Sequence, residues 1–586
     1  MRLLNTLPRA LSRAALPKST PQVTRRHASS SQSLPRRFLS TSLLLGGTVA
    51  FVSYYYDSRS LIHEHVVMPI VRLYDPETGH KLAIRILGGP WWLRPKDRGV
   101  DGPELKAEIF GLPVKNPVGM AAGFDKDGEA IDGLFDLGFG YVEIGSVTPE
   151  PQPGNPLPRF FRLEEDQACI NRYGFNSLGH GQTLGRMRAR LHTFAQENPS
   201  LFPSPAPHNP LPPSSLPRSL RPGHVLAVNL GKNKTSAADS NEDYVKGVRT
   251  LGPYADVVVI NVSSPNTPGL RALQGREILA KLLGDVVEER NKIKSPEGLP
   301  KIAVKVACDL SDDELGDVAA AVRKSGVDGV IVSNTTIRRK DLGLVSDNQH
   351  QIGGLSGKPL FPLALNALRT LRPLLPPSTP IIGCGGISSG SDAVEMARAG
   401  ASMIQVYTLF GYRGVGTPRL LKDEISTSLK GHTWKSQIGS DWQGKEMGWN
   451  ERRLEKESED LKKEAEGLGE LLRQMNDKEE FDRLVKEAEA AIRRPTAPRD
   501  NALGAEQSTP VTQAVSTQVG NALEQAIVAA IEAPSGRRTE GDESRVIEPA
   551  APGDEAGAGP SEPVEAVAEQ EDEWTRHVRS GQRRLV

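Results

Sequence analysis

The feature that most constrains the fold is a series of eight short apolar runs, each followed by a stretch with helical periodicity. The runs are PVGMAAGF, YVEIGSV, VLAVNLG, DVVVINVSS, KIAVKVA, GVIVSNT, PIIGCGG and MIQVYT. Short β-rich runs that alternate with helices predict parallel strands joined by crossover helices, an α/β fold. Eight such units predict a closed (β/α)8 TIM barrel. A doubly wound open sheet is the alternative, and the number of strands favours closure.

The N-terminal sequence predicts targeting and membrane attachment. Residues 1–56 contain arginines and serines but no Asp or Glu, which predicts a mitochondrial targeting segment over 1–37. The apolar stretch 38–56 has close to the roughly 20 residues of a spanning helix, so we expect one transmembrane helix there. With its basic flank in the matrix, the rest of the chain would face the intermembrane space from the mitochondrial inner membrane. The alternative is an uncleaved targeting helix ahead of a soluble matrix enzyme.

The remaining chain divides by composition. Residues 57–95 predict a small domain of two amphipathic helices, and 96–442 predict the barrel. Within the barrel, the proline-dense insertion 198–224 predicts a surface loop without helix or strand. Residues 443–494 predict a charged helical extension, and 495–586 have the composition of a disordered tail.

Polar side chains gather where the predicted strands end. They are Lys126, Ser146, Asn229, Asn261, Ser264, Asn266, Lys305, Ser333, Asn334, Thr335, Tyr407 and Thr408. Reacting groups of a barrel lie at the carboxyl ends of its strands, so these residues are site candidates. No histidine or paired acid closes a strand, and the three cysteines lack metal-ligand spacing. We therefore expect no metal site, and the balanced charge gives no argument for nucleic acid.

The same strand ends indicate a phosphorylated, planar ligand. Glycines after the seventh run, before a helix expected near Ser391, and in GGLSG, 353–357, offer backbone N–H groups to a phosphate. Lys305 could form a Schiff base or act as a fixed cation beside a flavin ring. Both readings stay open on the residues alone. The amides of four asparagines match the edges of a cyclic imide: Asn171, Asn261, Asn266 and Asn334.

Long ordered motifs carry a family resemblance. They are AAGFDKDGEAIDGL, GFGYVEIGSVTPEPQPGNPLPRFFRL, NRYGFNSLG, VNLGKNKT, INVSSPNTPGLR, GGLSGKPL, GCGGISSGSDA and AGASMIQVYT. Together they resemble class 2 dihydroorotate dehydrogenases, the membrane-bound, mitochondrial FMN enzymes of pyrimidine synthesis. The likeness runs from the N-terminal region to about Trp442 and leaves the remainder unexplained.

The resemblance implies oxidation of (S)-dihydroorotate to orotate with bound FMN and with ubiquinone as acceptor. Ser264 would be the base that takes the C5 proton while hydride leaves C6 for flavin N5; soluble class 1 relatives use a cysteine instead. The implied substrate residues are Lys126, Asn171, Gly174, Phe175, Asn261, Asn266, Asn334 and Thr335. The implied FMN residues are Ala122, Gly123, Lys126, Ser146, Asn229, Asn261, Lys305, Ser333, Ser356, Gly357, Gly385, Gly386, Tyr407 and Thr408.

For the quinone, the resemblance implies a site between the two N-terminal helices. Its residues would be Arg72, His80, Arg162 and Tyr407. Relatives often carry glutamine where this chain has Arg72. Cys308 replaces their usual proline, and Ser333 stands where many relatives have threonine.

Two other functions compete with this interpretation. One is another FMN barrel acting on a pyrimidine or a hydroxyacid. The other is a non-catalytic membrane scaffold that binds partners through its helical tail, although no obligate protein partner is evident.

Overall fold

The computed structural model describes residues 34–203, 210–267, 270–294, 298–445 and 463. The chain divides into two compact units, Met1–Arg473 and Gln474–Val586, and every described residue lies in the first. The targeting segment up to residue 33, nearly all of the charged extension 443–494 and the whole tail 495–586 lie outside the described residues.

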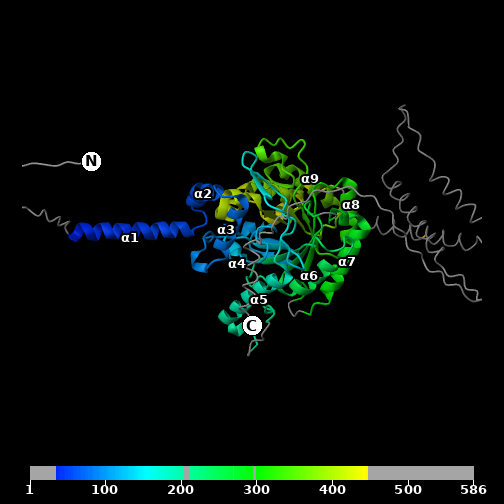
Figure 1. Ribbon diagram of the computed structural model, residues 1–586, viewed down its shortest axis with the longest axis horizontal. Helices are drawn as coiled ribbons and strands as arrows, with labels where there is room; N and C mark the ends of the chain where they lie inside the picture. The colour runs from blue at the N-terminus through cyan, green and yellow to red at the C-terminus, as the bar shows by residue number, and fades with distance from the viewer. Residues whose placement is uncertain (1–33, 204–209, 268–269, 295–297, 446–462, 464–586) are drawn as a thin grey trace, which may run out of the picture. The chain divides into compact units, whose positions relative to one another are not determined.

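The central element is a closed barrel of eight parallel strands, one from each predicted run (Figure 1). The strands are β3 Val118–Met120, β4 Tyr141–Val147, β7 Val225–Leu230, β8 Val257–Asn261, β9 Lys301–Val306, β10 Gly329–Val332, β12 Ile381–Cys384 and β13 Met403–Val406. The barrel closes where β13 pairs with β3, with Ile404 opposite Val118. The predicted barrel is confirmed, and the open-sheet alternative is wrong.

Helices surround the barrel and return each strand to the next. They include α4 Ile131–Asp136, α5 Gly179–Glu197, α6 Glu242–Leu251, α7 Arg276–Asn291, α8 Asp312–Ser325, α9 Phe361–Leu371, α10 Gly390–Ala399, α11 Thr408–Arg413, α12 Thr417–Ser428 and α13 Trp434–Gln437. Local sequence sets their ends: α8 begins at the capping box of Ser311 and Glu314 and ends at left-handed Gly326. Figure 1 shows α6, α7 and α8 in succession along one side of the molecule.

Two small antiparallel sheets were not predicted. One is the hairpin of β1 Ala107–Ile109 and β2 Leu112–Val114. The other joins β5 Phe160–Leu163, β6 Ala168–Asn171 and β11 Gly354–Gly357 in the order β11-β6-β5. The segment GGLSG, expected as a phosphate loop, is therefore largely a strand whose Gly354 lies opposite Asn171. This sheet carries side chains from two distant parts of the sequence to the mouth of the barrel.

The N-terminal region begins with helix α1, Leu34–Tyr56. Among the described residues, no helix is both long enough and apolar enough to span a membrane, so the transmembrane helix predicted over 38–56 is not supported. Helix α1 carries Ser40, Thr41, Ser42, Gly46, Gly47, Thr48 and Ser53 among its apolar residues.

Two short helices follow α1 within 57–95. A π-helical turn, His63–Val67, leads into α2, Met68–Arg72. Helix α3, Pro76–Gly88, begins where the Asp75 side chain accepts a hydrogen bond from the Thr78 backbone N–H at 2.8 Å.

The proline-dense insertion 198–224 is not simply a solvated loop. Its described residues include a short helical turn, Pro199–Leu201, and Arg218, Ser219 and Leu220 are buried, with Ser219 fully inaccessible. The buried Asp256 carboxylate accepts hydrogen bonds from the backbone N–H groups of Arg218 at 2.6 Å and Ser219 at 2.9 Å. Because this carboxylate satisfies the backbone donors, irregular chain can pack against the barrel.

Candidate active site

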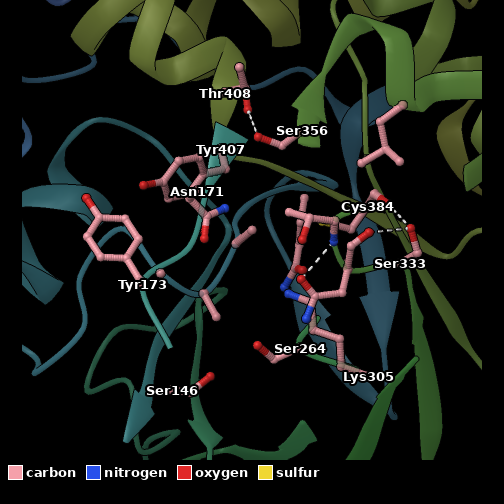
Figure 2. Close-up of a pocket in the computed structure, with 18 of the residues that line it drawn as sticks. Ser146, Asn171, Tyr173, Ser264, Lys305, Ser333, Ser356, Cys384, Tyr407 and Thr408 are labelled. Atoms are coloured by element: carbon pink, nitrogen blue, oxygen red, sulfur yellow. Dashed lines mark hydrogen bonds between the residues drawn. The ribbon is translucent and has the colours of Figure 1, made fainter. Parts of the chain in front are cut away.

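The residues at the strand ends converge on a single cavity at the carboxyl end of the barrel (Figure 2). Ser264, from the loop after β8, and Lys305, from β9, both line it. Every predicted substrate residue lines it as well. Of the predicted FMN residues, all except Asn229 do so. The antiparallel sheet β11-β6-β5 contributes Asn171 and Ser356, so residues of this sheet and residues of the barrel line the pocket together.

Ser264 is buried, with 7% of its surface exposed. Its Oγ accepts one hydrogen bond, from the Asn266 backbone N–H at 3.3 Å. Within the described part of the chain, no histidine or carboxylate hydrogen-bonds to this hydroxyl. A serine oxygen has two lone pairs and one proton, so one lone pair remains for a proton from a substrate.

The asparagines form a connected set rather than independent turn formers. Asn266 Nδ2 donates to Asn171 Oδ1 at 3.3 Å, joining the β8 loop to β6. Asn334 Nδ2 donates to Asn261 Oδ1 at 3.3 Å, joining the segment after β10 to the end of β8. Asn261 Nδ2 in turn donates to Ser146 Oγ at 2.9 Å. The pocket wall therefore presents several amide groups whose orientations are coupled.

Lys126 approaches the cavity from the segment after β3. Its Nζ donates to Asn176 Oδ1 at 2.5 Å and lies 3.3 Å from the centroid of the Tyr173 ring. Burial, with a smaller contribution from Arg159, lowers the pKa of Lys126 to about 7. The ammonium therefore titrates near neutral pH, and an anionic ligand would favour its charged form.

Lys305 has a different environment. Its Nζ lies 3.6 Å from Glu143 Oε1, and the Glu143 side chain is fully buried. Burial acts to lower the pKa of Lys305, but the Glu143 carboxylate, with a smaller contribution from Cys384, outweighs burial, and the net pKa is above the ordinary value. Lys305 is therefore a fixed cation at neutral pH. A Schiff-base nucleophile needs a neutral amine, so this environment favours the fixed-cation reading.

Glycines after β12 shape another wall of the pocket. Gly385 has φ 127° and Gly386 has φ 73°, both in the region that favours glycine. A Cβ on Gly386 would lie 2.1 Å from the Phe361 backbone nitrogen. Helix α10 begins nearby, but the Ser389 and Asp392 side chains cap its first turn, and neither residue lines the pocket. The glycines ahead of this helix, rather than its capped first turn, therefore form the wall.

Asn229 lies one layer deeper than predicted. It is fully buried and does not line the cavity. Its Nδ2 donates to Glu143 Oε1 at 2.8 Å, and its Oδ1 accepts from Asn261 Nδ2 at 3.2 Å and from the Ser146 hydroxyl. It supports pocket residues rather than facing a ligand.

The predicted quinone residues lie in two pairs, His80 near Tyr407 and Arg162 near Arg72. His80 Nε2 bonds the Phe124 carbonyl at 2.7 Å, and its ring lies 6.3 Å from that of Tyr407. Arg162 Nη1 donates to the Arg72 carbonyl at 3.1 Å. Of the four, only Tyr407 lines the main cavity. Burial, together with the charge of Lys126, lowers the pKa of His80 to about 4, so its imidazole is neutral near pH 7.

Sequence reasoning missed several pocket residues. Tyr173, Asn176, Cys384 and Gln405 line the cavity, and Glu143 lies beside it. The available signal for Glu143 and Gln405 was a charged or amide side chain inside an otherwise apolar strand run, in YVEIGSV and MIQVYT. Burying such a group carries a free-energy cost unless it is paired.

A closed α/β barrel with a polar, cationic pocket at the carboxyl ends of its strands defines a barrel enzyme. A family model described as Dihydroorotate dehydrogenase matches residues 104–429. The chain belongs to the dihydroorotate dehydrogenase family, and its resemblance to the mitochondrial, quinone-dependent members is confirmed.

Relatives and solved structures support the assignment. The Schizosaccharomyces pombe protein named dihydroorotate dehydrogenase (quinone), mitochondrial, is 50% identical over 68% of this chain and 90% of its own length. The Mus musculus protein of the same name is 44% identical over 68% of this chain and 94% of its own length. The crystal structure of DHODH from Eimeria tenella in complex with ferulenol matches with TM-score 0.56 and 37% identity, covering 63% of this chain and 96% of the other.

Proposed function

We propose that this enzyme oxidises (S)-dihydroorotate to orotate in pyrimidine synthesis, with FMN as bound cofactor and ubiquinone as electron acceptor. The observation that carries the proposal is the meeting of Ser264, Lys305 and the coupled asparagines around one cavity. A planar imide with a carboxylate needs both amide partners and a cation, and the pocket supplies both.

Three features of the pocket support a bound flavin. Lys305 places a fixed positive charge at the cavity, where it would stabilise negative charge on the reduced ring. Gln405 Oε1 is buried without a hydrogen-bond partner among the described residues, so the pocket holds an acceptor for an imide N–H. The wall at Gly385 and Gly386 has no side chain, which lets a bulky group approach the backbone. The chemistry that bound FMN would supply here is acceptance of a hydride and transfer of two electrons to a second acceptor.

The residues of the chain then have separate tasks. Lys126 would bind the substrate carboxylate, and the asparagines would hold the ring amides so that C5 faces Ser264. Ser264 would take the C5 proton while C6 loses hydride, which leaves a carbon–carbon double bond. Because no imidazole or carboxylate assists Ser264 within the described residues, its own hydroxyl proton must pass to water as the new proton arrives. In total, two electrons and two protons reach the quinone.

The surroundings of His80 in helix α3 support a second site, for the quinone. Tyr407 lines the cavity and its ring lies near His80, so one side chain joins the two regions. Apolar side chains of this region are exposed, among them Leu61, Ile70, Leu73, Ile86, Trp91 and Trp92. A lipid-soluble acceptor needs such a surface. We propose a location at the mitochondrial inner membrane, which this surface supports; the names of the relatives support a mitochondrial location.

An anaerobic absorbance spectrum tests the proposal. The purified protein should show bound oxidised flavin, and dihydroorotate should bleach it in the absence of oxygen. Added quinone should restore the colour. A colourless protein would favour the scaffold alternative, and flavin that lactate but not dihydroorotate bleaches would favour a hydroxyacid enzyme.

A further inference from the structure

A polar and charged layer lies inside the barrel next to the candidate active site. It consists of Glu143 from β4, Asn229 from β7, Lys305 from β9 and Gln405 from β13. Their exposed fractions are 0%, 0%, 5% and 1%. The interior of such a barrel is ordinarily filled by branched apolar side chains. A buried ion pair is weak support for stability because both charges lose hydration, so this layer calls for a functional explanation.

Glu143 is the centre of the layer. Its Oε1 accepts from Asn229 Nδ2 at 2.8 Å and lies 3.6 Å from Lys305 Nζ. Its Oε2 accepts from Gln405 Nε2 at 2.6 Å and from the Tyr141 hydroxyl at 3.4 Å. The carboxylate therefore joins groups from β4, β7, β9 and β13.

The chemistry of a carboxylate fixes the direction of these hydrogen bonds. An ionised carboxylate only accepts, so both amides must turn their nitrogens toward Glu143. The Asn229 oxygen then faces Ser146 and Asn261, and Asn261 in turn accepts from Asn334. Glu143 thus sets the amide orientations along a chain that ends at predicted substrate residues.

We propose that Glu143 is a positioning residue that keeps Lys305 protonated at the flavin site and orients the Asn229 and Gln405 amides around it. This inference rests on the proposed function, because it concerns the charge beside a bound flavin. Glu143 does not line the cavity, so it acts through its neighbours.

Few other ionisable groups face Lys305. The Cys384 thiol, at the end of β12, interacts with it, and the Tyr141 hydroxyl faces Glu143. Burial raises the pKa of Cys384 and of Tyr141, so both remain neutral near pH 7. Within the described residues, Glu143 is the anion that faces Lys305. Without it, burial alone would favour the neutral amine.

The test is the reduction potential of the bound flavin as a function of pH, measured on the purified holoenzyme. In the wild type, Lys305 stays charged, so it adds no change of slope to the plot of reduction potential against pH between about pH 6 and about pH 9. In Glu143→Gln, which keeps the side-chain size, the lysine should lose its proton within that interval. Above its pKa, reduction takes up one additional proton, so the slope should steepen there. Arginine stays protonated, so Glu143→Gln combined with Lys305→Arg should remove the break.

The outcomes separate this inference from the proposed function. Wild-type protein without flavin contradicts the proposed function. Glu143→Gln that binds flavin and gives a plot parallel to the wild type overturns the inference. If Glu143→Gln does not fold, the same plot of flavin reduction potential against pH is compared between the wild type and Lys305→Arg. A break below about pH 9 that appears in the wild type but not in Lys305→Arg overturns the inference. Parallel plots for the two proteins support it.

Discussion

The hydroxyl of Ser264 has one observed partner, the Asn266 N–H, which makes its replacement easy to interpret. Ser264→Ala removes the proposed proton acceptor and leaves the predicted FMN contacts in place. We expect flavin content to be retained, while the rate of flavin reduction by dihydroorotate falls by about 10²- to 10⁴-fold. Stopped-flow absorbance under anaerobic conditions measures this rate directly.

Ser264→Cys is the matched control. A thiol has an ordinary pKa of about 8.5, so the reduction rate of this variant should rise with pH toward that value, while Ser264→Ala stays slow throughout. Reduction of Ser264→Ala within about twofold of the wild-type rate would show that Ser264 is not the base.

Lys126 gives a prediction of pH dependence. Its pKa in the ligand-free protein is about 7, because burial disfavours the ammonium. If Lys126 holds the carboxylate of orotate as proposed, that carboxylate will bind the protonated form, so affinity should be full below about pH 7. Above that pH, the dissociation constant should rise about tenfold per pH unit until the higher pKa of the complex is passed. Flavin difference spectra at each pH measure the constant. Lys126→Arg stays protonated and should bind almost independently of pH; a parallel pH dependence in that variant would contradict the assignment.

Among the elements, helix α3 is fixed to the segment before β5 by a buried ion pair. Arg159 donates to both Glu77 oxygens at 2.9 Å, and their side chains are 11% and 7% exposed. Burial alone would raise the pKa of Glu77, but Arg159, with a smaller contribution from Lys81, lowers it to about 2, from 4.5. Glu77→Gln should therefore lower the free energy of unfolding at pH 7 by about 3 kcal/mol. Urea denaturation followed by tryptophan fluorescence measures the loss.

The sign of the pH effect follows from the depressed pKa of Glu77. Its stabilisation is complete above about pH 4.5 and is lost as pH falls toward about 2. The stability difference between wild type and Glu77→Gln should therefore shrink by about 1 kcal/mol from pH 7 to pH 4. Lys81 also pairs with Glu77, at 3.2 Å, but is 64% exposed, so Lys81→Met should cost less than about 1 kcal/mol. Equal losses for the two variants would show that burial of the Arg159 pair is unimportant.

The elements also show what periodicity can predict. All eight barrel strands were predictable because each is a local apolar run followed by a helix. The sheet β11-β6-β5 was not, because β6 and β11 are far apart in the sequence and their pairing is a tertiary contact. Asn229 was predicted to line the site but lies in the buried layer beneath it, for a related reason. The sequence shows that a strand is ending, but not which of its last residues points into that layer. The polar residues Glu143 and Gln405 were passed over because each stands alone in an apolar run.

At the scale of the whole molecule, the barrel extends beyond the end of the family match. That match ends at residue 429, yet Trp434 is fully buried and its indole N–H donates to the Ser402 carbonyl at 2.8 Å. Trp442 likewise donates to the Ala399 carbonyl at 2.8 Å. Both carbonyls lie at the connection between α10 and β13, beside the strand that closes the barrel. We therefore predict that the catalytic unit needs the chain as far as Trp442, the boundary that the motifs in the sequence indicate.

Truncation tests this boundary. A chain that ends at residue 445 keeps both indole contacts, so it should retain flavin content, dihydroorotate oxidation and melting temperature close to those of the full chain. A chain that ends at residue 431 lacks Trp434, and removal of a buried tryptophan costs about 3–5 kcal/mol, a large fraction of a typical stability of about 5–15 kcal/mol. It should melt many degrees lower and lose flavin during purification.

The variant Trp434→Ala in the full chain separates loss of this contact from loss of the segment, and should reproduce most of the decrease in melting temperature. Equal melting temperatures for the chains ending at 431 and 445 would place the boundary at the end of α12 instead.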